Sequence, residues 1–278
     1  MNIQRILYIL AALPLVWLAG CDKNDELPVD TTSQEIVFDI LFADDDPSTT
    51  KVATATDFTS SWETGDEVGV YIVKGNGGLK ASGNWVDNMA LTYGGGAWTA
   101  STSLYYPNDG DKLSFYAYYP YDAGMTNPNA YAFNVPIDQA SNSGEYYKKN
   151  DFLWAKLENV SKSDNSVVLP FSHALAMIQI AIYDNESTPP AVNLLNVITD
   201  CTINLADQSI TPGSTKNTIQ MWRRHTINLT FFRWALVPPQ TMDIRFVWTK
   251  NSTNYTVTPA TNVTLTSGNI KKYTTTQP

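Results

Sequence analysis

The chain contains few of the residues on which catalytic and metal sites depend. Among its 278 residues there are only two cysteines and two histidines. Cys21 and Cys201 are too few for a disulfide framework. His173 and His225 lie far apart in the chain, and neither has the spacing of a zinc site. The sequence therefore predicts no cofactor and favours a protein that is not an enzyme.

Two groups of residues could still carry chemistry. His173 follows Ser172, but a catalytic triad depends on a geometry that a sequence does not show, so we expect a structural histidine that caps the start of a core strand. The acidic run Asp44-Asp45-Asp46 could bind calcium in principle, although it lacks the pattern of an EF-hand. No two acidic residues stand out as a glycosidase pair. Neither group is a specific signal for catalysis.

Positive charge is also scarce. The 18 Lys and Arg residues face 27 Asp and Glu residues, which gives a net charge of −9 at pH 7. Binding to phosphates needs a basic patch, so we expect no nucleic-acid partner. The hydrophobic fraction of 43% is ample for a core, and a length of 278 residues favours two domains.

The longest apolar run near the start of the chain is too short to cross a membrane. It covers residues 6–17, Pro14 interrupts it, and a spanning helix takes about 20 residues. Arg5 precedes the run and small residues follow it, which is typical of a secretory signal over residues 1–20. Leu18-Ala19-Gly20-Cys21 resembles the bacterial lipoprotein box, whose cysteine is lipidated. The alternative is an ordinary secreted protein in which Cys21 is structural.

The resemblance to the lipoprotein box implies that Cys21 is acylated and held in outer-membrane lipid. Residues 21–34 are polar and read as a tether between the lipid and the first strand. Asp22 to Glu26 further resembles the short signal that sends such lipoproteins to the outer face of the outer membrane. Lipidation leaves Cys201 alone, and its strand-like surroundings predict a partly buried, inert thiol.

Sustained helical periodicity is absent, and period-2 alternation takes its place. Apolar residues alternate over residues 36–42, 68–72, 113–119, 178–182 and 244–248. A tight hairpin is expected over residues 203–210. Strands without helices between them predict an all-β fold of antiparallel sandwiches or barrels. A polar patch at residues 162–165 predicts two β-sandwich domains, one over residues 35–163 and one over residues 164–278.

Several segments of the mature chain resemble those of the fimbrillin family, the lipoprotein precursors of type V pili in the Bacteroidetes. No one of them is specific, but they occur in the family's order. They are WETGDEVGVY at 62–71, SFYAYYP at 114–120, DFLWA at 151–155, LPFSHA at 169–174, ALVPPQ at 235–240 and LTSG at 265–268. The resemblance implies two transthyretin-like β-sandwiches and a structural or adhesive role in a surface fimbria.

The resemblance also implies a route of assembly. In the family, the first strand completes the first sandwich until a trypsin-like surface protease cuts behind it, and a strand of another fimbrial subunit then takes its place. On this chain the removable strand would present four alternate apolar residues to the groove: Ile36, Phe38, Ile40 and Phe42. The cut would fall between Lys51 and Val52.

Three alternatives stay open. Lys51 can be a solvated lysine in a loop that is never cut. Residues 274–278 lack large alternating apolar side chains, so either the chain ends early or it accepts a strand without donating one, as a tip or end subunit would. The rival hypothesis is a stand-alone outer-surface lipoprotein that binds glycans through exposed aromatic rings. Its candidate rings are Trp85, Trp98, Trp222, Trp234 and Trp248. A tip adhesin with a host or glycan ligand would combine both roles.

Overall fold

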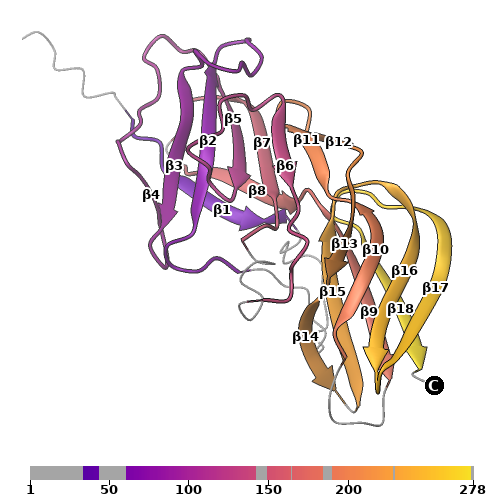
Figure 1. Cartoon of the computed structure of the whole chain (residues 1–278). Coiled ribbons are helices and arrows are strands. Elements are labelled where there is room, and N and C mark those ends of the chain that lie inside the picture. Colours follow the sequence, from indigo (N-terminus) through magenta and orange to yellow (C-terminus); the bar gives the residue numbers. More distant parts are fainter. Residues whose placement is uncertain are drawn as a thin grey trace, which may run out of the picture. The chain divides into compact units, whose positions relative to one another are not determined.

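The structure is a computed structural model that describes residues 34–43, 61–141, 149–163, 165–183, 190–227 and 229–276, with the side chains of residues 224–227 excepted. These residues form strands β1 to β18 and no α-helix (Figure 1). The predicted all-β class is therefore confirmed.

The strands are numbered in chain order. They are β1 (Phe38–Phe42), β2 (Glu67–Lys74), β3 (Val86–Tyr93), β4 (Trp98–Ala100), β5 (Leu113–Tyr119), β6 (Tyr131–Asn134), β7 (Leu153–Val160), β8 (Val167–His173), β9 (Ala176–Tyr183), β10 (Val192–Ile198), β11 (Asp200–Asn204), β12 (Ser209–Pro212), β13 (Lys216–Gln220), β14 (Trp222–Ile227), β15 (Thr230–Val237), β16 (Thr241–Lys250), β17 (Thr253–Thr264) and β18 (Ile270–Thr276).

The first sheet contains seven strands in the order β1-β8-β7-β5-β2-β3-β4. β1 runs parallel to β8, and the other pairs in this sheet are antiparallel. Just before β1, the N–H of Ile36 donates to the carbonyl of Leu104 at 2.7 Å, and the N–H of Tyr106 donates to the carbonyl of Gln34 at 2.9 Å. The chain ahead of β1 thus meets the chain that follows β4, so the two edges of the sheet approach each other around one core.

The central strands of this sheet are buried on both faces. Val70 and Ile72 of β2 belong to the core that contains β1, whereas Tyr71 and Val73 belong to a second core. The exposed fraction of each of these four side chains is 4% or less. A strand covered on both sides needs apolar residues at consecutive positions, which explains the run of large residues in β2.

Gly69 of β2 is required by the close approach of a tyrosine ring. It lies directly opposite Tyr118 of β5 in the ladder. A Cβ at residue 69 would lie 2.1 Å from Cε1 of Tyr118. The Tyr118 hydroxyl is fixed in turn, because it donates to Oδ1 of Asn88 at 2.7 Å and accepts from the N–H of Asp122 at 3.2 Å. The glycine therefore lets the two strands pair while the ring lies across β2.

Three smaller sheets make up the rest of the described chain. Their strand orders are β14-β15-β9-β18, β13-β10-β16-β17 and β12-β11-β6. Ile178, Ile180 and Ile182 of β9 are fully buried, as their alternation predicts. They share one core with Val192 and Leu194 of β10, so the two four-stranded sheets enclose a common interior. β18 runs parallel to β9, which is the second parallel pair in a fold expected to be antiparallel.

Two local predictions can be compared with these strands. The expected hairpin over residues 203–210 is present, since β11 and β12 pair antiparallel with Asn204 opposite Ser209. The division between residues 163 and 164 stays a prediction. β8 follows that division but pairs with β1 and β7, and its Leu169 and Phe171 lie in the core that contains β1. The strand pairing favours a domain boundary near Ala174 instead, because Ala174 belongs to the other core.

Candidate functional site

The candidate site is the place of β1 at the edge of the seven-stranded sheet, and the core side chains that β1 covers there are called the groove. Inward-facing Ile36, Phe38 and Ile40 are 5%, 6% and 3% exposed, whereas Val37 and Leu41 between and beyond them are 55% and 47% exposed. This difference follows from the pleat of a strand, which sends successive side chains to opposite faces. The predicted set of alternate residues is therefore brought onto one face, with half-buried Phe42 at its end.

The floor of the groove consists of side chains from the seven-stranded sheet. Phe38 meets Phe115 of β5 edge-on, with ring centroids 5.9 Å apart. The other buried side chains of this core come from the sheet and from the segment after β4: Val68, Val70, Ile72, Leu91, Trp98, Tyr106, Leu113, Ala117, Leu153, Ala155, Val167, Leu169 and Phe171. An apolar groove of this composition accepts alternate apolar side chains of one added strand.

An aromatic cluster forms the end of the groove. The ring of Phe42 stacks on the indole of Trp62, with centroids 4.6 Å apart and an interplanar angle of 22°. Trp62 also meets Trp98, Tyr119 and Phe171 edge-on, at centroid distances of 5.0, 5.4 and 5.6 Å. Its Nε1 is buried and has no hydrogen-bond partner among the described residues. Sequence reasoning missed this role for Trp62, because nothing local to the tryptophan shows which strand end reaches it.

The backbone of β1 is held mainly from one side. Residues Phe38 to Phe42 pair in parallel with Val167 to Phe171 of β8. Among the described residues, the contact on the other side of this segment is an isolated bridge between Glu35 and Tyr105, ahead of β1. β1 is therefore an edge strand whose inward side chains are buried, while one side of its backbone lacks a continuous ladder among the described residues.

The remaining site predictions concern residues that the structure does not describe. Cys21, Lys51 and Val52 lie outside the described residues, as does the acidic run at residues 44–46. Lipidation and proteolytic processing therefore stay predictions. Residue 43 is the last described residue after β1, and the description resumes at residue 61, close to Trp62.

The two histidines lie on different strands, β8 and β14. His173 ends β8 rather than starting a core strand, so the expected place of this residue was wrong. Its Nδ1 lies 2.9 Å from Oδ2 of Asp151, an acceptor from the loop before β7 that sequence did not reveal. His225 contributes backbone pairing with Phe232. No described group of three or more His, Cys, Asp or Glu residues is placed to hold a metal ion.

Cys201 lies in β11 and is 5% exposed. Burial, with the charge of Asp200 as a smaller cause, raises the pKa of its thiol to about 12. The thiolate is the reactive form of cysteine, so this side chain is inert at neutral pH, as its strand-like surroundings predict.

Over the described ranges, no helix is both long and apolar enough to cross a membrane.

The aromatic rings expected of a glycan platform are mostly core residues. Trp98 and Trp222 are each 8% exposed, Trp234 is 4% exposed and Trp248 is 1% exposed. Trp234 also donates from Nε1 to Oε1 of Gln179 at 3.1 Å. Trp85 alone among the five candidates presents a large exposed fraction, 39%. The platform prediction fails for the other four, because each packs into a sheet interior.

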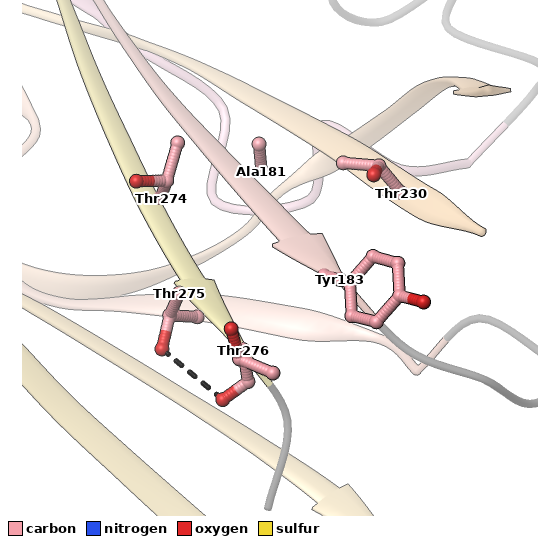
Figure 2. A pocket seen from close by; sticks show the side chains of 6 residues that line it. All are labelled: Ala181, Tyr183, Thr230, Thr274, Thr275 and Thr276. Atoms are coloured by element: carbon pink, nitrogen blue, oxygen red, sulfur yellow. Dashed lines mark hydrogen bonds between the residues drawn. The ribbon is translucent and has the colours of Figure 1, made fainter. Parts of the chain in front are cut away.

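A shallow hollow lies at the ends of β9, β15 and β18 (Figure 2). Its volume is about 430 Å³, and the ring of Tyr183, which is 48% exposed, stands at its rim. The rest of the lining is Ala181, Thr230, Thr274, Thr275 and Thr276. These residues supply hydroxyl groups and one aromatic ring. The hollow can therefore form hydrogen bonds.

The fold is shared with solved structures described as cell adhesion proteins. One from Bacteroides uniformis superposes with a TM-score of 0.66 at 22% sequence identity, over 90% of this chain and 94% of that one. Another from Bacteroides ovatus superposes with a TM-score of 0.58 at 19% identity, over 88% and 91% of the two chains. At these identities the likeness concerns the all-β fold alone.

The family follows from sequence. The fimbrillin-like family matches residues 50–277, and the chain belongs to this family. A protein of Bacteroides uniformis named as a fimbrium subunit, Fim1C, is 27% identical over 224 residues, which are 76% of this chain and 69% of that protein. The resemblance seen in the sequence motifs is thereby confirmed.

Proposed function

We propose that the chain is a subunit of a surface fimbria that is exported as a lipoprotein and assembled by exchange of β1. In this proposal Cys21 carries the lipid anchor in the outer membrane. β1 fills the first sheet until a trypsin-like surface protease cuts at Lys51-Val52. A strand of another fimbrial subunit then occupies the groove.

The observation that carries the proposal is the alternation along β1. Ile36, Phe38 and Ile40 are seated in the core, although β1 lies at a sheet edge and continues into residues 44–60, which contain Lys51. Full burial of one such side chain stabilises a fold by roughly 1.5–3 kcal/mol. Release of β1 would uncover three of them at once, together with a row of unpaired backbone groups on β8. The emptied groove would therefore bind another apolar strand strongly.

Lys51 is the expected cut site because the chain has no other basic residue between Asn24 and Val73. A trypsin-like protease that cuts in this stretch has one site available. The cut would separate the lipid-bearing segment and β1 from the body of the protein. The same cleavage would thus release the anchor and open the groove.

The test is a brief treatment of the purified chain with a trypsin-like protease. Intact mass and N-terminal sequencing would identify the cut, and size exclusion and a native gel would follow the products. The proposal expects one early cut at Lys51-Val52, loss of the N-terminal fragment and the appearance of higher oligomers. An added peptide of residues 34–43 should suppress these oligomers by occupying the groove. A cut product that retains its fragment and stays monomeric would contradict strand exchange.

The second candidate is a stand-alone glycan-binding lipoprotein. It rests on exposed Trp85 and on the hollow beside Tyr183, where an aromatic ring and hydroxyl groups lie together. It expects a monomer that keeps β1 after protease treatment and that binds to a glycan array. Removal of the Tyr183 ring by Tyr183→Ala would abolish that binding if the hollow is responsible.

A further inference from the structure

Two arginines lie opposite each other on neighbouring strands of one small sheet. Arg223 of β14 is the direct cross-strand partner of Arg233 of β15. Directly opposite residues in an antiparallel pair have Cβ atoms about 4.5–5.5 Å apart and point to the same face. On its other side, Arg233 lies opposite Ile180 of β9, a fully buried residue. The two arginines therefore share the face of the sheet that carries the core, at its β14 edge.

Arg233 is a buried charge that is held by backbone carbonyl groups. Its side chain is 2% exposed, and its guanidinium donates to the carbonyl of Pro190 at 2.7 Å and to the carbonyl of Phe232 at 3.2 Å. No carboxylate of the described residues forms an ion pair with it. A guanidinium has more N–H donors than these two bonds use, so donors remain for a further acceptor.

The arrangement is unfavourable as it stands. Burial, and secondly the charge of Arg223, lowers the pKa of Arg233 to about 10. Like charges directly opposite each other on a sheet destabilise it, and a buried charge without a partner is costly. Arg223 is exposed, so it could turn to bulk water, but Arg233 cannot. A bound negative group would remove both penalties.

We propose that Arg223 and Arg233 together form a binding site for an oxyanion at the β14 edge of the sheet. The planar fork of a guanidinium matches a carboxylate, a sulfate or a phosphate through paired hydrogen bonds. Arg223 would meet the anion at the surface, and Arg233 would hold it from inside. The chain as a whole is acidic, with a net charge of −9, so two arginines directly opposite each other contrast with its overall charge. The site is independent of strand exchange at β1.

The experiment measures thermal unfolding of the purified chain in acetate, sulfate and phosphate, each titrated against chloride at constant ionic strength. The three anions separate a carboxylate source from a sulfate or phosphate source. We expect a saturable rise of the midpoint with at least one of them. Charge-assisted hydrogen bonds of this kind are strong enough that losing one arginine should weaken binding about tenfold or more.

Three variants make the result specific. Arg223→Gln removes the exposed arginine and should fold, while Arg233→Met removes the buried charge at similar volume. Both should lose the saturable rise, and Arg233→Met should approach or exceed the wild-type midpoint in chloride. Arg245→Gln, at an exposed position of β16, controls for the general stabilising effect of sulfate and should keep the rise.

Two outcomes would overturn the proposal. One is an equal anion response in the wild type, Arg223→Gln and Arg245→Gln, which would leave only a general salt effect. The other is an Arg233→Met protein that is destabilised at every anion concentration, beside a wild type without a saturable response. In that case Arg233 only supports the backbone at Pro190.

Discussion

The ring of Phe42 stacks on the indole of Trp62 at a centroid distance of 4.6 Å, and this contact fixes the end of β1 in its groove. The two residues stand on either side of residues 44–60, the segment that contains Lys51. The stack joins a residue before that segment to a residue after it, whether or not the segment is cut. The strength of the stack therefore helps to determine how readily β1 leaves after a cut.

Phe42→Ala should destabilise the protein by about 1–3 kcal/mol, because the variant loses a half-buried ring and an aromatic pair. Leu41→Ala is the matched control, since Leu41 is the preceding residue and is 47% exposed. We expect the control to change the unfolding free energy by no more than about 0.5 kcal/mol. Denaturant midpoints at constant slope would measure both. Equal effects for the two variants would show that the stack contributes little.

Lys51→Ala should abolish the early protease cut, whereas Lys51→Arg should keep it, since a trypsin-like protease needs a basic residue. Lys74→Ala is the control on a lysine within a strand, because Lys74 belongs to β2 and pairs with Asp109. Intact-mass time courses would follow all three variants. Persistence of the same early fragment in Lys51→Ala would place the accessible site elsewhere.

Gly69→Ala should destabilise the fold by about 1–3 kcal/mol or more, because the new Cβ would lie 2.1 Å from the Tyr118 ring. Gly78→Ala is the matched control, since a Cβ at residue 78 meets nothing within 4 Å. Chemical denaturation would compare the unfolding free energies of the two variants. A neutral Gly69→Ala would mean that the ring shifts freely, despite its bonds to Asn88 and Asp122.

The unfolding free energy should decline at alkaline pH, and Cys201 should be the first group to lower it. The thiol has an ordinary pKa of 9.0, which burial raises to about 12 in the folded state. Its contribution is therefore fully present below pH 9 and is lost as the pH rises toward 12, because only the unfolded chain releases the proton. One such group gives a slope of about 1.4 kcal/mol per pH unit.

Cys201→Ala should remove the share of that slope due to the thiol between about pH 9 and 10, where the tyrosines of the unfolded chain, with an ordinary pKa near 10, also begin to ionise. Burial also raises the pKa of several tyrosines, among them Tyr71, Tyr118, Tyr119 and Tyr131, so both proteins should lose stability at higher pH. Denaturant unfolding at pH 8, 9 and 10 would measure the difference. Parallel curves for the two proteins over this range would contradict the assignment to Cys201.

Local patterns in the sequence were sufficient to predict single strands and which of their side chains face the core. The buried triplet Ile178, Ile180 and Ile182 and the inward face of β1 follow from period-2 alternation, which a half-covered sheet imposes. The hairpin between β11 and β12 follows from the turn residues between them. In each case the physical cause lies within a few residues, so the sequence carries it locally.

Long-range pairing could not be predicted in the same way. Nothing within Phe38–Phe42 indicates that β1 runs parallel to β8, which is more than a hundred residues away in the chain. The partner of His173, the ring beside Gly69 and the stack on Trp62 likewise depend on strands brought together by the fold. The Arg223–Arg233 pair depends on the register of β14 and β15, which the sequence does not specify by itself.

The parallel pairs at the two outer strands have a mechanical consequence. β1 runs parallel to β8, β18 runs parallel to β9, and only Ala174 and Leu175 separate β8 from β9. A tension applied ahead of β1 and behind β18 would pull each outer strand lengthwise against its neighbour. The hydrogen bonds of each ladder would then bear the load together, in shear, rather than opening one after another. While β1 is in place, a protein pulled from both ends would resist rupture through this arrangement of the first and last described strands.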